Sequence, residues 1–155
     1  MKKYIGTKRI EAEPMTRGAY NKYRGWTIPA NENPEDEGYL VKYSDGYVSW
    51  SPKAMFEEAY RECDHMTFGI AIEAMKMGHK VARRGWNGKG MWVVYRTGYP
   101  EGIPCNKNTA DAVGIPEGTL FKVRPYLQMK CVDDSFQMWL ASQSDILAED
   151  WMIVE

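Results

Sequence analysis

The residues best suited to chemistry lie together in one short segment, Arg83-Arg84-Gly85-Trp86-Asn87-Gly88-Lys89-Gly90-Met91-Trp92. Three glycines fall within six residues of this segment, between two predicted strands. Backbone amides in such a loop can point at one ligand, and concavities of this kind bind phosphate oxygens. Trp86 could stack on a base, and Asn87 could donate to a phosphate or read a base edge. The segment therefore suits an anionic ligand that carries an aromatic ring.

The charges along the chain agree with this interpretation. The whole chain has a net charge of −1, which argues against a general binder of nucleic acid or of membrane surfaces. Between Ala74 and Pro100, however, there are six Lys or Arg residues and no Asp or Glu. We therefore expect a local positive field around the glycine-rich segment.

The same segment can also be an ordinary tight hairpin, with Asn87-Gly88 as the turn, Trp86 in the core and the charges on a solvated face. It is not a P-loop, because the GxxxxGK[ST] spacing is absent and no helix follows, and it is not a dinucleotide-binding fingerprint. The residues leave both interpretations open.

A second candidate group lies near the carboxyl end of the chain, at Ser142, Gln143, Ser144 and Asp145. The spacing of Ser142 and Asp145 is that of a capping box, with Asp in place of Glu or Gln, and predicts a short helix to about residue 149. Hydroxyls, an amide and free backbone N–H groups at a helix start suit anion or ribose contacts. The alternative is a capped helix with core aromatic residues beside it.

A coherent catalytic set is missing from the sequence. His65 and His79 are the only histidines, neither lies in a metal-ligand spacing, and no GxSxG pattern is present. The acidic pairs Asp133-Asp134 and Glu149-Asp150 are predicted to be turn and surface residues. We expect a binding protein, not an enzyme, with no cofactor and no metal.

Three scattered cysteines without a CxxC pair indicate reduced thiols in a cytoplasm. No apolar run is long enough for a membrane span, and no signal-peptide pattern follows the start. We therefore expect a soluble, cytoplasmic protein.

The predicted fold class is α+β, with a small, largely antiparallel sheet and two or three short helices, because most strand connections are short. Residues 1–38 are polar and turn-rich, and residues 99–118 form a long excursion with one helical turn at 109–113. Hairpin strands are predicted at 39–43 and 47–50, followed by a helix that Ser51 caps. A helix is predicted at 67–77, and further strands at 80–84, 91–96, 119–123, 126–132 and 151–154.

Three blocks of the sequence resemble a small phage and prophage domain family that contains the second class of Thoeris anti-defence proteins. They are DHMTFGIAIEAMKMG, KVARRGWNGKGMW and WLASQSDILAEDWMIVE, in the order usual for the family, and together they span residues 64–155. One departure is Ile70, where the family usually has Glu after Gly, so the capping box at that helix is lost. Residues 1–63 lie outside the resemblance and are expected to form an N-terminal α+β extension of unknown function.

The resemblance implies a phage anti-defence protein that sequesters a nucleotide-derived immune signal without cleaving it. Members of the family act as sponges for glycocyclic ADP-ribose, and some also take up cyclic dinucleotides. They assemble as homotetramers with ligand pockets between subunits. Carried over by position, the pocket would use Arg84, Trp86, Asn87, Gly88 and Lys89, with residues 142–145 from the same or a partner subunit. Two alternatives remain: an enzyme that cleaves such a nucleotide, and a protein-interaction or structural phage module without a small-molecule ligand.

Overall fold

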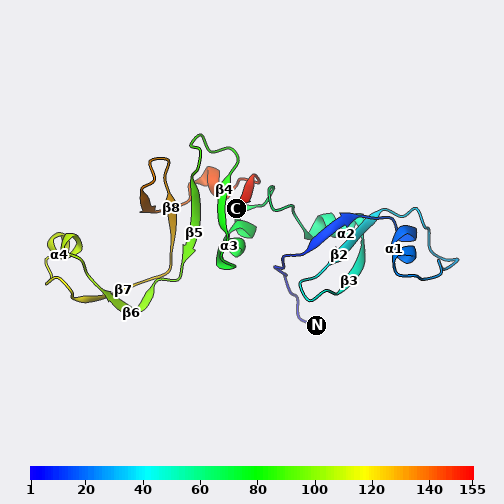
Figure 1. Ribbon diagram of the computed structural model, residues 1–155, viewed down its shortest axis with the longest axis horizontal. Coiled ribbons are helices and arrows are strands. Elements are labelled where there is room, and N and C mark those ends of the chain that lie inside the picture. Colours follow the sequence, from blue (N-terminus) through cyan, green and yellow to red (C-terminus); the bar gives the residue numbers. More distant parts are fainter. The chain divides into compact units, whose positions relative to one another are not determined.

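The computed structural model describes all 155 residues and divides the chain into two compact units (Figure 1). Unit 1 is Met1–Arg61 and unit 2 is Glu62–Glu155. Each unit has its own antiparallel sheet, and the chain contains five helices. The predicted α+β class is confirmed, although the number of helices is larger than the two or three expected from the sequence.

Unit 1 is a three-stranded antiparallel sheet with two short helices. Its elements in chain order are β1 (Glu11–Pro14), α1 (Arg17–Tyr23), β2 (Gly38–Lys42), β3 (Val48–Pro52) and α2 (Lys53–Ala59). The predicted hairpin is confirmed as β2 and β3, joined through a turn in which Gly46 adopts a φ of 86°. Apart from two glycines, only Tyr20, Asn21 and Val41 are almost wholly buried, so the core of this unit is small.

One prediction for unit 1 is wrong, and two of its elements were not predicted. The polar, turn-rich residues 1–38 contain β1 and α1; all four β1 residues are exposed, so the strand lacks the alternation by which strands are found. Ser51 does not cap α2. The helix begins one residue later, at Lys53, and its N-cap Pro52 offers no side-chain acceptor.

Unit 2 is built on a five-stranded antiparallel sheet in the order β10-β4-β5-β8-β9. The strands are β4 (Lys80–Arg83), β5 (Trp92–Arg96), β8 (Tyr126–Lys130), β9 (Phe136–Met138) and β10 (Trp151–Val154). Four of them match predicted strands. The short edge strand β9 was not predicted, because it is a three-residue segment whose side chains are all exposed.

The helix α3 (Phe68–Lys76) packs on one face of this sheet. It begins where predicted, since the side chain of Thr67 accepts a hydrogen bond from the backbone of Ile70. The core between helix and sheet includes Met75, Val93 and Trp151, and Trp151 has no exposed surface. A second helix, α5 (Gln143–Ile146), lies between β9 and β10 in the chain. None of the helices is long and apolar enough to cross a membrane.

Residues 97–125 form an arm that leaves the sheet between β5 and β8 (Figure 1). It is a two-stranded ribbon of β6 (Tyr99–Pro104) and β7 (Leu120–Val123), with α4 (Lys107–Val113) between them. The sequence predicted the strand β7, at 119–123, but predicted a loop with one helical turn at 99–118, because β6 contains two prolines and a glycine. The helical turn is confirmed, but the loop is an ordered ribbon: β6 pairs with β7 through an irregular register between Tyr99 and Ile103.

Candidate ligand-binding site

The two candidate blocks predicted from the sequence meet in the fold. The indole Nε1 of Trp86, in the β4–β5 turn, donates a hydrogen bond to Oδ1 of Asp145 in α5 over 3.0 Å. Residues 59 positions apart in the chain are thus in direct contact within a single subunit. Residues 142–145 therefore adjoin the turn of their own subunit, a point that the sequence left open.

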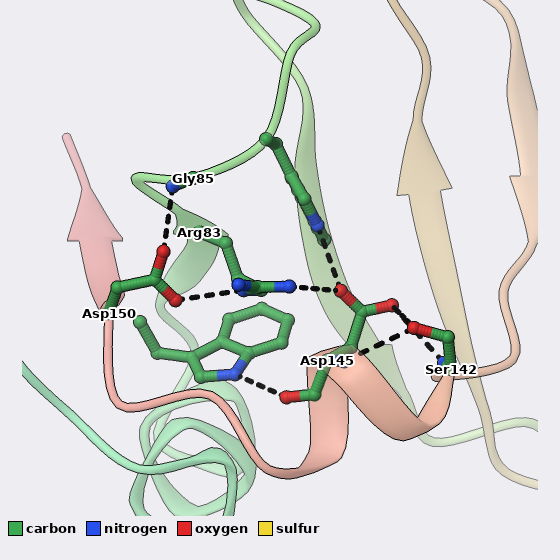
Figure 2. Close-up of polar contacts among 7 residues, drawn as sticks. Arg83, Gly85, Ser142, Asp145 and Asp150 are labelled. Carbon is green, nitrogen blue, oxygen red and sulfur yellow. Dashed lines mark hydrogen bonds and ion pairs between the residues drawn. The ribbon is translucent and has the colours of Figure 1, made fainter.

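Arg83 holds this arrangement together from the end of β4. Its Nη1 lies 3.0 Å from Oδ1 of Asp145, and its Nε lies 2.8 Å from Oδ1 of Asp150. The second oxygen of Asp150 accepts a 2.7 Å hydrogen bond from the backbone N–H of Gly85 (Figure 2). The start of the turn is therefore fixed to the segment that precedes β10.

Arg83 and Asp150 are the residues that the sequence analysis missed. Asp150 was predicted to be a surface residue, and this is wrong: it is half-buried and bonded to both Arg83 and Gly85. The two partners are 67 positions apart, so no spacing rule could have joined them. The pairing of β4 with β10 would have revealed the contact. It places Arg83 opposite Trp151, so Asp150, the residue before Trp151, lies next to the end of β4.

Asp145 is the centre of the polar network. Besides Arg83 and Trp86 it contacts Ser142 reciprocally, since its Oδ2 accepts from the Ser142 hydroxyl at 2.7 Å and its backbone N–H donates to that hydroxyl at 3.1 Å. The predicted capping box is confirmed. Burial alone would raise the pKa of Asp145, but the hydrogen bonds from Trp86, Ser142 and Arg83 outweigh it and lower the pKa to about 2.

The ring of Trp86 packs inward, against other tryptophans. Its centroid lies 5.4 Å from that of Trp151 and 6.0 Å from that of Trp139, both in edge-to-face geometry. With its N–H bonded to Asp145 as well, Trp86 is half-buried and adds to the core of unit 2. This geometry favours the structural interpretation of Trp86 over that of a base-stacking residue.

The outward part of the turn is what remains for a ligand. Asn87 and Lys89 are exposed, and Lys89 makes no ion pair. Gly88 between them is half-buried, and a Cβ there would overlap the Met91 sulfur and meet a methyl group of Val132. On α5, Gln143 and Ser144 are exposed. These residues offer amide, hydroxyl and ammonium groups without an internal partner.

The predicted positive field is weaker than the count of cations suggested. Arg83 is neutralised by Asp145 and Asp150, and the guanidinium of Arg84 lies 3.1 Å from Oδ2 of Asp64. The acidic partners come from segments outside the acid-free stretch. In the turn itself, Lys89 is the cation that keeps its charge uncompensated.

Three ligating groups gather beside Arg84, from Glu62, Asp64 and His65, with ligand atoms within 4.8 Å of one another. Asp64 is already bonded to His65 over 2.9 Å and to Arg84. The hydrogen bond from His65 lowers the pKa of Asp64, as does that from Arg84. A cation would have to displace Arg84, so the group is best described as an exposed ion-pair cluster.

Comparison with known proteins identifies the domain. Residues 66–154 match the Thoeris anti-defense 2-like domain, and the chain belongs to that family. A relative, Thoeris anti-defense 2 of Bacillus phage SP01, is 34% identical over 89 residues, which cover 57% of this chain and 94% of that protein. The resemblance found in the sequence is confirmed. The match begins at Met66, so unit 1 lies outside it.

The low pKa of Asp145 predicts an acid-sensitive fold. A carboxylate whose pKa is depressed in the folded state stabilises that state above its unfolded pKa, and the contribution is lost as the pH falls through the folded value. For Asp145 the loss falls between about pH 4 and about pH 2. We expect wild-type unit 2 to lose ~2 kcal/mol more unfolding free energy over this window than Asp145→Asn.

The measurement is urea unfolding at several acidic pH values, followed through the indole NMR signals of unit 2. Asp111→Asn, which removes an exposed carboxylate on α4, should keep the wild-type pH slope. An unchanged slope in Asp145→Asn would contradict the assigned pKa.

The packing around Gly88 predicts that the turn does not tolerate a side chain. Gly88→Ala would force apart Met91 and Val132, and overpacking of this kind costs about 1–3 kcal/mol. Gly69→Ala is the matched control, because the nearest atom to a Cβ in the first turn of α3 is 4.0 Å away. The control should be neutral or stabilised by ~0.5 kcal/mol in thermal unfolding. Equal stability of the two variants would show that the turn is not packed as described.

Proposed function

We propose that the protein is a phage anti-defence protein that binds a nucleotide-derived immune signal and sequesters it without cleaving it. Glycocyclic ADP-ribose is the first ligand to consider and cyclic dinucleotides are the second. Membership of the Thoeris anti-defense 2-like family carries the proposal. The site of action is the cytoplasm of an infected or lysogenic bacterial host.

The fixed glycine-rich turn supports this function. Arg83, Asp145 and Asp150 hold the base of the turn in place, while Asn87 and Lys89 stay exposed at its tip. A ligand that meets a rigid loop loses less free energy in ordering it. The tip offers backbone amides, one side-chain amide and one uncompensated ammonium group, which are suitable donors to a pyrophosphate.

The acidic residues nearest the turn support sequestration over cleavage. A general acid or base works best when its pKa lies near the operating pH. The pKa of Asp145 is lowered to about 2, and the hydrogen bond from Arg83 lowers that of Asp150 against the effect of burial. Both carboxylates are ionised and occupied at neutral pH, so neither is poised to transfer a proton.

A protein-interaction role is the second candidate, and it concerns unit 1. This unit lies outside the family match and exposes Tyr23, Trp26 and Tyr47 to 58%, 51% and 62%. Exposed aromatic residues are enriched in protein interfaces. A chain that acts only in this way would bind no nucleotide.

We further propose that the protein is a homo-oligomer, a tetramer by analogy with the family, in which subunits close around the ligand. The arm of residues 97–125 supports this. It exposes Val113 at 60% and Leu120 at 66%, on a ribbon whose own elements pack chiefly on one another. Another subunit is a suitable cover for these side chains.

The ligand prediction is tested by calorimetric titration with glycocyclic ADP-ribose isomers and a panel of cyclic dinucleotides. We expect tight binding to at least one of them and recovery of intact ligand after the complex is heated. Asn87→Ala and Lys89→Ala should each weaken binding by about 10-fold, because each removes one donor to the ligand. Glu58→Ala, an exposed change in unit 1, is the control. Recovery of a chemically altered ligand would indicate an enzyme. If no compound gave a heat of binding, the proposal that the protein sequesters one of these nucleotides would be refuted.

The oligomer prediction is tested by light scattering on a sizing column. Wild-type protein should have a mass well above the 17.8 kDa of one chain, and Leu120→Arg should shift it toward that value. Glu117→Arg, also exposed on the arm, introduces the same side chain without removing an apolar one. A monomeric wild-type protein, or a Leu120→Arg variant of unchanged mass, would contradict the role of the arm.

A further inference from the structure

The face of the five-stranded sheet opposite α3 is open and carries an unusual set of side chains. Successive residues of a strand alternate between faces, and directly paired residues share one. Since Val81, Val93 and Met129 point into the core, their neighbours in each strand lie on the open face. That face carries Lys80, Ala82, Trp92, Val94, Arg96, Tyr126, Gln128, Lys130, Phe136, Met138, Met152 and Val154.

This open face combines cations with aromatic rings and has no acidic residue on its strands. The rings of Trp92 and Phe136 meet at 5.8 Å in edge-to-face geometry, and Phe136 is 56% exposed. The ammonium group of Lys80 lies 5.6 Å from the centre of the Trp92 ring. Lys80 and Arg96 make no ion pair, while Lys130 pairs with Asp134 in the β8–β9 turn. The face is therefore positive and able to stack on a planar group.

The open face is continuous with the glycine-rich turn. Trp92 follows the turn directly in the chain, and Nζ of Lys130 donates to the carbonyl of Gly90 over 3.3 Å. Val132, in the turn between β8 and β9, packs against Gly88. A ligand whose phosphates contact the tip of the turn can therefore extend over the sheet at Trp92.

We propose that this open face is the base-binding platform of the site, with Trp92 stacking on the base of a phosphate-bearing nucleotide and Phe136 and Lys80 bordering it. The proposal rests on the nucleotide binding proposed above, and it assigns a role that the sequence had given to Trp86. Trp86 is not free for that role, because its ring packs on Trp139 and Trp151 and its N–H is bonded to Asp145. Trp92 is the aromatic residue beside the turn that faces away from the core.

The charges favour a nucleotide over a second copy of the chain. In a two-fold dimer the same patch would meet itself, so the positive patch of one subunit would face the positive patch of the other. Like charges brought together in this way disfavour association. A phosphate-bearing ligand would instead be attracted by them, and its base would find an aromatic surface.

The test measures the binding of glycocyclic ADP-ribose and of cyclic di-GMP to the full-length protein. Calorimetry gives the affinity, and NMR gives the chemical shifts of the base protons. Stacking on an indole should move these signals upfield. Trp92→Leu should abolish the shift and weaken binding by about 10-fold or more, and Trp92→Tyr should restore most of both. Lys80→Gln should weaken binding and reduce its dependence on salt. Tyr23→Leu, an exposed aromatic change in unit 1, is the control.

The outcomes separate this proposal from the function on which it rests. If wild-type protein binds neither compound, the proposed function fails first. If wild-type protein binds and Trp92→Leu retains affinity and the upfield shift, the base stacks elsewhere and the platform is refuted. Light scattering on the same samples gives the third outcome: a lower oligomeric mass in Trp92→Leu would make the face an interface between copies and would also overturn the proposal.

Discussion

The guanidinium of Arg83 is the contact on which the candidate site depends. It joins the end of β4 to two neighbouring segments that lie 62 and 67 positions further along the chain: the helix α5 through Asp145, and the residues before β10 through Asp150. The side chains of Arg83 and Asp145 are largely shielded from solvent, and that of Asp150 is half-buried. Removing one partner would leave a partly buried charge uncompensated, which costs far more than the loss of a surface ion pair. The geometry of the turn is thus tied to the stability of the unit.

Local signals explain which features could be predicted from the sequence. The caps at Thr67 and at Ser142 and Asp145 depend on residues within one helical turn, and the strands depend on alternation within a few residues. Long-range contacts explain the failures. The partnership of Arg83 with Asp150 and the pairing of β6 with β7 across α4 depend on segments that only the folded chain brings together. The same holds for the inward orientation of Trp86, which the sequence left open as one of two interpretations.

The same reasoning applies to charge. Counting residues from Ala74 to Pro100 found an acid-free stretch, but Arg83 and Arg84 find acidic partners in other segments. The charge that remains uncompensated, at Lys80, Lys89 and Arg96, lies at the tip of the turn and on the open sheet face. On the strands, the alternation of side chains between the two faces decides which cations reach solvent, and the number of cations along the segment does not.

A protein that sequesters a signal must hold it tightly without lowering any barrier to its cleavage. Tight binding is favoured when the contacting groups are fixed before the ligand arrives, since the entropy of ordering them is then a cost of folding and not of binding. The carboxylates nearest the turn serve this rigidity: Asp145 and Asp150 are committed to Arg83 and to the backbone of Gly85. The arrangement that fixes the turn also keeps these two acids from acting as proton-transfer groups, so in the proposed function tight binding and the absence of cleavage would have one physical origin.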